Sequence, residues 1–246
     1  MKLAIHQPEF MPWLGFFNKM TLADEYVVLD HVQFKKRYFE NRNRILSPQG
    51  QELYAGVPVI SKGRFEQAIR EVEIDNSQTW KPKLLGRIRN CYARSPHFDR
   101  YYPELRRLIE DIQYTRLIDL NLALIDFFRT HFEITCPLIH SSSLEVAAYT
   151  GSDLILRICR LRGADVYLCG ASGRDYLRLE DFRKSNIEIV WLDYQCPRYK
   201  QLSPRFVPNM SALDLLFNHG PAAREIMIHG AAGSNMENYN VDSGTE

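Results

Sequence analysis

Two short apolar runs end in polar residues that could bind a ligand or transfer a proton. His6 and Gln7 follow "KLAI", and Asp30 and Gln33 follow "EYVVL". Histidine titrates near neutral pH, glutamine offers both a donor and an acceptor, and a carboxylate accepts a proton. We therefore expect His6, Gln7 and Asp30 to be catalytic and Gln33 to bind substrate. The alternative for His6 is a structural role at the end of its strand.

A basic run follows in segment 31–44, which reads "HVQFKKRYFENRNR" and holds five Lys or Arg against one Glu. Guanidinium and carboxamide groups bind phosphate or carboxylate through paired hydrogen bonds. The alternative is a solvated, mobile charge run. We expect an anion site for the substrate, formed by Lys36, Arg37, Asn41, Arg42, Asn43 and Arg44.

The segment "GASGRDY" at 170–176 is a third candidate, because it follows an apolar run and contains two glycines spaced three apart. Such a loop lets backbone N–H groups approach a phosphate, although the Gly-Lys-Ser/Thr of a P-loop is missing. Ser142 follows another apolar run, where helix capping is the alternative role. We expect Gly170, Ser172, Gly173, Arg174 and Asp175 to bind a cofactor, and Ser142 and Tyr176 to bind substrate.

The composition excludes several classes of protein. The 246 residues carry 31 basic and 30 acidic side chains, so we expect no DNA partner. The five cysteines form no C-x-x-C pair, which favours a reducing cytoplasm, and no apolar run is long enough to span a membrane. Seven dispersed histidines predict no protein-bound metal, and the missing G-x-S-x-G argues against a serine hydrolase.

Strands and helices alternate at both ends of the chain. The first thirty residues predict a strand, a helix that begins at Pro12, and a second strand; the same rhythm returns after Pro137. Trp13, Phe16 and Phe17 share one face of that first helix. The alternation predicts an α/β fold with a doubly wound, mostly parallel, Rossmann-like sheet. Ligands bind beyond the carboxyl ends of such strands, where the polar groups would meet.

The middle of the chain predicts an insertion at about 41–135 within a single domain spanning 1–228. A β-hairpin is expected around "PQGQ", a further strand at 69–75, and helices at 80–92, 103–112 and 117–132. Residues 229–246 are rich in Gly, Ser and Asn, so we expect a flexible tail there.

Four motifs together resemble the WbqC-like family: "IHQPEFMPWLGFFNKM", "LDHVQFKKRYFENRNRI", "GASGRDYL" and "NMSALDLLFNHG". Members occur in bacterial gene clusters for O-antigen and other surface polysaccharides, and a glycine transferase role has been suggested for them. The family pattern more often has an acidic residue where this chain has His31. The resemblance implies tailoring of a sugar or another small molecule.

The start of the chain also looks like that of nucleotidylyltransferases and pantothenate synthetase, which hold ATP phosphates with a His-x-Gly-His turn. Here Trp13-Leu14-Gly15-Phe16 stands in that place, so the glycine is kept and both histidines are aromatic. From this likeness we retain Gly15 as a cofactor-binding candidate and Trp13 as a substrate-binding candidate.

These patterns predict a transferase or ligase that forms an amide between a glycine-like amino acid and a sugar acid, amino sugar or related molecule. The expected substrate is a small molecule or nucleotide sugar. ATP with Mg²⁺ would activate the acid, unless aminoacyl-tRNA or an acyl carrier donates it. The alternatives are a nucleotidylyltransferase-like enzyme and a non-catalytic scaffold that docks a partner through Trp13, Phe16 and Phe17. A homo-oligomer is also an open expectation.

Overall fold

A five-stranded, all-parallel sheet forms the centre of the computed structural model, which describes residues 1–229. The strands lie in the order β5-β2-β1-β6-β7. Their bounds are β1 (Lys2–His6), β2 (Glu25–Val28), β5 (Leu138–His140), β6 (Val166–Gly170) and β7 (Glu188–Leu192). The predicted α/β fold with a parallel, Rossmann-like sheet is confirmed. Except for His229, the residues of the predicted flexible tail, 229–246, lie outside the described residues.

Helices cover both faces of the sheet, because side chains along each strand point alternately to one face and the other. In β1, Leu3 and Ile5 pack in the cluster formed with α5 (Gly151–Arg162) and α6 (Leu179–Arg183). Ala4 belongs instead to the larger core, with α1 (Leu14–Leu22) and α4 (Leu117–His131). The central strands β1 and β2 are thus buried on both faces, as expected for a doubly wound fold.

The first helix begins two residues later than predicted. Trp13 occupies the N-cap position with an extended backbone, so Pro12 precedes the helix. Phe16 and Phe17 are fully buried against the sheet and α4. Trp13 packs on Tyr194, with ring centroids 5.6 Å apart. The aromatic docking surface expected for a scaffold protein is therefore mostly core.

The segment between β2 and β5 begins with the predicted hairpin, β3 (Arg42–Leu46) and β4 (Glu52–Gly56). The helices α2 (Trp80–Tyr92), α3 (Phe98–Glu110) and α4 follow. Helix α3 begins five residues before the predicted start at 103, because Phe98 and Tyr101 continue the buried face of Leu105 and Ile109.

The strand predicted at 69–75 is wrong. Ile69–Glu71 forms a 3₁₀ turn, and Glu73 and Ile74 make only isolated bridges. The side chains of Ile69 and Val72 are both buried, and their spacing of three suits such a turn better than an alternating strand.

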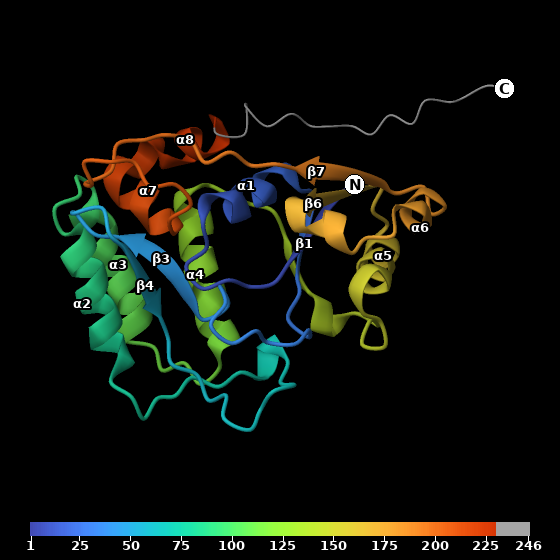
Figure 1. The fold of residues 1–246 in the computed structure, drawn as a ribbon, viewed down its shortest axis with the longest axis horizontal. Helices are drawn as coiled ribbons and strands as arrows, with labels where there is room; N and C mark the ends of the chain where they lie inside the picture. Colours follow the sequence, from blue (N-terminus) through green and yellow to red (C-terminus); the bar gives the residue numbers. More distant parts are fainter. Residues whose placement is uncertain (230–246) are drawn as a thin grey trace.

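The described part of the chain ends with two helices, α7 (Ala212–His219) and α8 (Ala223–His229), which pack beside α1 and the hairpin (Figure 1). The 3₁₀ turns are Ile69–Glu71, Ser141–Ser143, Ala171–Asp175 and Gly220–Ala222. Among the described residues, no helix has both the length and the apolar character needed to cross a bilayer.

Candidate functional site

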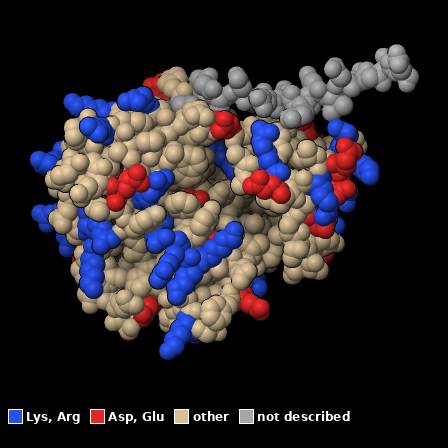
Figure 2. All heavy atoms as spheres, viewed as in Figure 1, with Lys and Arg blue, Asp and Glu red and all other residues tan. Residues whose placement is uncertain are grey.

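A cleft of about 560 Å³ lies where the strand order reverses. From β1 the chain proceeds outward to β2 and β5, then returns to β6 on the other side of β1. Loops diverge at such a point and leave a crevice beyond the carboxyl ends of the two strands. The molecule is hollowed there, near the centre of the face in Figure 2, and Lys and Arg side chains gather along one rim.

Seven of the residues singled out from the sequence line this cleft. His6 and Gln7 come from the end of β1, and Gly170 from the end of β6. The turn after β6 contributes Ser172, Gly173, Asp175 and Tyr176. The structure thus brings together two groups that are more than 160 residues apart in the chain.

Asp30 lies outside the lining of the cleft and holds two loops together. Its carboxylate accepts hydrogen bonds from Ser141 Oγ at 2.8 Å, and from the Ser142 backbone N–H at 2.8 Å and Oγ at 2.6 Å. His140 Nδ1 adds a fourth contact at 3.2 Å. These four donors outweigh the effect of burial and lower the pKa of Asp30. Asp30 and Ser142, predicted for catalysis and substrate binding, pair with each other.

The neighbouring Ser141 and His31 lack the geometry of a nucleophile and its base. His31 Nδ1 lies 2.6 Å from Ser141 Oγ, but the only hydroxyl proton of Ser141 goes to Asp30. The histidine therefore donates to the serine, whereas a general base must accept from it. Ser141 is also completely buried. This group of hydrogen-bonded residues, Asp30 with His31 and residues 140–142, is called the Asp30 cluster below.

Most of the residues predicted to bind an anion make contacts within or next to the hairpin instead. Arg42 stacks on Tyr54 at 4.3 Å, and Arg44 pairs with Glu52 at 2.9 Å. The amides of Asn41 and Asn43 donate to backbone oxygens of Val57 and Phe10. Lys36 and Arg37 are exposed but do not line the cleft. From the basic run, the lining residues are Val32, Lys35, Tyr38, Phe39 and Glu40.

Other predicted residues have packing or hydrogen-bonding partners. A Cβ on Gly15 would lie 2.3 Å from the Trp13 ring, so the glycine gives the indole room. A Cβ on Gly173 would meet Cys169 Sγ at 2.1 Å, so Gly173 is also needed for packing. The remaining two lie away from the cleft lining: Gln33 Nε2 donates to Phe65 O, and Arg174 stacks on Trp191 at 4.7 Å.

Three buried acidic or basic side chains in the cleft were not singled out from the sequence: Glu9, Lys19 and Glu40. Lys19 projects from α1, and its Nζ lies 3.8 Å from where a Cβ of Gly170 would be. Burial lowers the pKa of Lys19. Its sequence signal was a lysine inside "LGFFNKMTL", an otherwise apolar helix.

The segments that carry the two glutamates run side by side. Phe10 N–H donates to Phe39 O at 2.9 Å. The fully buried Asn121 donates its amide both to Pro8 O at 3.2 Å and to Glu40 O at 2.8 Å. One side chain of α4 thus fixes both segments at the wall of the cleft. A carboxyl group directly after the first strand was the only sequence signal for Glu9.

The pKa values of His6 and Glu9 are shifted in opposite directions. Burial, assisted by the Lys19 ammonium, lowers the pKa of His6 to about 3. Its Nδ1–H donates to Gln7 O at 3.0 Å, so the ring is neutral with Nε2 as the acceptor. Burial, reinforced by Glu40 and opposed by Lys19, raises the pKa of Glu9 to about 8. Glu9, rather than His6, changes its protonation near neutral pH.

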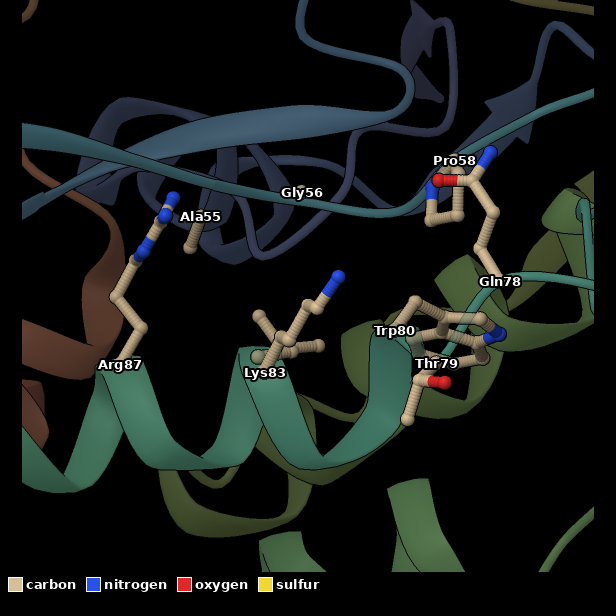
Figure 3. Close-up of a pocket in the computed structure, with 9 residues that line it drawn as sticks. Ala55, Gly56, Pro58, Gln78, Thr79, Trp80, Lys83 and Arg87 are labelled. Carbon is tan, nitrogen blue, oxygen red and sulfur yellow. The ribbon is translucent and has the colours of Figure 1, made fainter.

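A second, smaller cavity of about 170 Å³ lies between β4 and α2. Lys83 and Arg87 point from α2 toward the strand that carries Ala55 and Gly56 (Figure 3). Arg87 Nη1 donates to Tyr54 O. This cavity contains none of the residues predicted from the sequence.

No group of three or more His, Cys, Asp or Glu side chains within residues 1–229 is arranged to hold a metal ion. The strand order and the cleft at its reversal point define a Rossmann-like α/β protein with a ligand-sized cleft beyond β1 and β6.

Comparison with known proteins identifies the family. The family model described as "WbqC-like protein family" matches residues 7–226, and the chain belongs to this family. An "Uncharacterized protein Rv1507c" from Mycobacterium tuberculosis (strain ATCC 25618 / H37Rv) is 34% identical over 227 residues, which cover 92% of this chain and 97% of the relative. No solved structure gives a significant match. The family resemblance expected from the four motifs is confirmed.

Proposed function

We propose that this protein is a transferase or ligase that forms an amide between a glycine-like amino acid and a sugar acid, an amino sugar or a related small molecule. The observation that carries the proposal is the burial of Lys19 and Glu9 in one cleft at the reversal point of the sheet. Membership of the WbqC-like family supports a role in surface-polysaccharide or small-molecule biosynthesis.

Amide formation needs an activated acyl group, a free amine and a group that takes the proton of the amine. The nitrogen attacks the acyl carbon, the C–N bond forms, and the bond to the leaving group breaks with its electron pair. One proton leaves the nitrogen. Glu9 suits this transfer because its pKa of about 8 lies close to neutral pH. His6 remains neutral and acts as a hydrogen-bond partner.

Lys19 is suited to stabilise the negative charge that develops on the acyl oxygen or on the departing group. A cation already fixed in a cleft requires no reorganisation during the reaction. The turn that carries Gly170 and Ser172 lies on the same side as Lys19, and Lys35 lies at the wall. Together they would hold the phosphates of ATP, the cofactor that we expect with Mg²⁺ to activate the acid.

The test is to incubate the purified protein with ATP, Mg²⁺, glycine and candidate nucleotide sugars and to analyse the products by mass spectrometry. The expected result is an amide product, with AMP or ADP released. Lys19→Met should lower the rate about 10²- to 10³-fold. The exposed Lys62→Met is the matched control and should leave the rate unchanged.

A second arm replaces ATP and glycine with glycyl-tRNA or a glycyl carrier protein. Amide formation in this arm alone would show that the acid arrives already activated. If neither arm gives an amide, or if Lys19→Met behaves like Lys62→Met, the proposed function is wrong. Release of pyrophosphate with a nucleotide joined to the sugar would favour the nucleotidylyltransferase alternative instead.

A further inference from the structure

The walls of the cleft contain three carboxyl oxygens without a hydrogen-bond partner. They are Glu9 Oε2 and both side-chain oxygens of Glu40. Glu40 is only 1% exposed and Glu9 only 7%, yet both line the cleft. Buried carboxylates without partners are costly, so most are paired in folded proteins. The two side chains therefore have acceptor capacity that no group of the described chain uses.

The surroundings of the pair restrict what that ligand can be. Burial raises the pKa of Glu40, and the Lys35 ammonium and the nearby backbone N–H groups of Lys35 and Glu40 offset part of the rise. Lys19 and Glu40 both act on Glu9, and burial together with the charge of Glu9 raises the pKa of Tyr26. Neither glutamate forms an ion pair with a lysine. A further positive charge would therefore be stabilised between the two carboxyls.

We propose that Glu9 and Glu40 together bind the primary ammonium group of the substrate. An ammonium group has three N–H donors and no acceptor, and the pair offers three unpartnered acceptor oxygens. Hydrogen bonds between ionised groups are the strongest available to such a pair. The inference rests on the proposed function and adds to it the reason why an amine, rather than a hydroxyl, is selected.

Two substrates could supply the ammonium group: an aminoacyl donor through its α-amino group, or an amino sugar acceptor. In the second case the same contact precedes the chemistry. The ammonium first loses one proton to Glu40, the nitrogen lone pair then attacks the acyl carbon, and Glu9 takes the second proton as the bond to the leaving group breaks. In the first case the ammonium stays protonated and orients the acyl group.

Direct binding to the purified full chain tests the inference without turnover. Isothermal titration calorimetry at about pH 7 would compare glycinamide with propionamide, in which a methyl group replaces the ammonium. A second arm would compare glucosamine with glucose. In at least one arm, the cationic ligand should bind about tenfold or more tightly than its neutral counterpart; the arm that does so identifies the source of the amine.

Substitutions test whether Glu9 and Glu40 cause the preference for the cationic ligand. Glu40→Gln should reduce that preference about tenfold, Glu40→Asp should restore part of it, and the exposed Glu66→Gln should leave it unchanged. Because Glu9 is partly protonated at neutral pH, binding should also release protons. The heat should then vary with the ionisation enthalpy of the buffer, and Glu9→Gln should abolish this variation. Circular dichroism would verify that each variant is folded.

Three outcomes would overturn the inference: equal binding of cationic and neutral ligands in both arms, a preference untouched by Glu40→Gln, or tight Mn²⁺ binding that Glu40→Gln removes while no ammonium preference exists. The last would assign the pair to a divalent cation. Because binding is measured without reaction, a missing amide product counts against the proposed function alone. Product formation without ammonium selectivity counts against this inference alone.

Discussion

Glu9 and Asp30 follow neighbouring strands of the same sheet, and both carboxyl groups are almost fully buried. Asp30 accepts hydrogen bonds from four donors, and its pKa is lowered. Glu9 has an unpartnered oxygen beside Glu40, and its pKa is raised to about 8. Burial raises the pKa of both carboxyl groups, so the number of hydrogen-bond donors around each one decides whether its pKa ends up lowered or raised. The satisfied carboxylate holds the fold together, and the unsatisfied one is available to a ligand.

The largest expected effect is that of a Glu9 substitution on activity. Glu9→Gln keeps the shape of the side chain but removes the group that takes the proton, so the rate of amide formation should fall about 10²- to 10⁴-fold. The measurement is initial rate by mass spectrometry, with Glu66→Gln as the control. A rate within a factor of three of wild type would remove Glu9 from the reaction.

The next effect is the pH dependence of stability. In the unfolded chain Glu9 ionises near pH 4.5, whereas in the folded chain it stays protonated up to about pH 8. The folded state binds the extra proton between these values, so this group makes the protein less stable as pH rises from about 4.5 to 8. Glu9→Gln removes this loss of unfolding free energy, which is on the order of 4 kcal/mol at pH 8.

Urea unfolding of wild type and Glu9→Gln at pH 5, 6.5 and 8 measures this effect. The free energy of unfolding of the variant, relative to wild type, should increase with pH. The contribution of His6, whose lowered pKa makes it act in the opposite direction below pH 6.5, cancels in the difference. A difference that stays constant over this range would contradict the raised pKa.

A smaller effect on stability is expected from a substitution in the Asp30 cluster. Asp30→Asn replaces a charged acceptor with an amide that matches fewer of the four donors, and should cost about 2–3 kcal/mol of unfolding free energy. Because the pKa of Asp30 is lowered, its stabilisation is present above about pH 4 and lost below it. Urea unfolding at pH 7 and at about pH 3 would measure both. If activity per folded molecule fell more than tenfold while stability was unchanged, Asp30 would belong to the catalytic site.

The smallest effect concerns the hairpin. Arg44 forms a partly exposed ion pair with Glu52, and its side chain also donates to Asn209 O. Arg44→Ala should change the free energy of unfolding by about 1 kcal/mol or less and leave the rate nearly unchanged. Chemical unfolding and the activity assay measure this. A large rise in KM for the anionic substrate would restore Arg44 to the substrate site that the sequence predicted.

Alternating strand and helix patterns were sufficient to predict the sheet, because apolar periodicity is a local property. The same locality explains why the predicted strand at 69–75 is wrong. Val72 and Ile74 alternate as in a strand, but contacts of this segment with α4 and the loop before it decide the backbone. The ends of β1 and β6 were predicted to carry the site, since ligand sites in parallel sheets follow from topology.

The sequence by itself determined the fold class, the family, and the presence of His6, Gln7 and the 170–176 turn at one edge of the sheet. Only the tertiary structure decided which charged side chains are buried there. Asn121, 81 residues after Glu40, joins the segments of Glu9 and Glu40, and Lys19 reaches the cleft from a helix that is mostly apolar. The pKa of a carboxyl depends on its desolvation and on the donors around it. Those are set by residues distant in the chain, so Asp30 and Glu9 could not be told apart before folding.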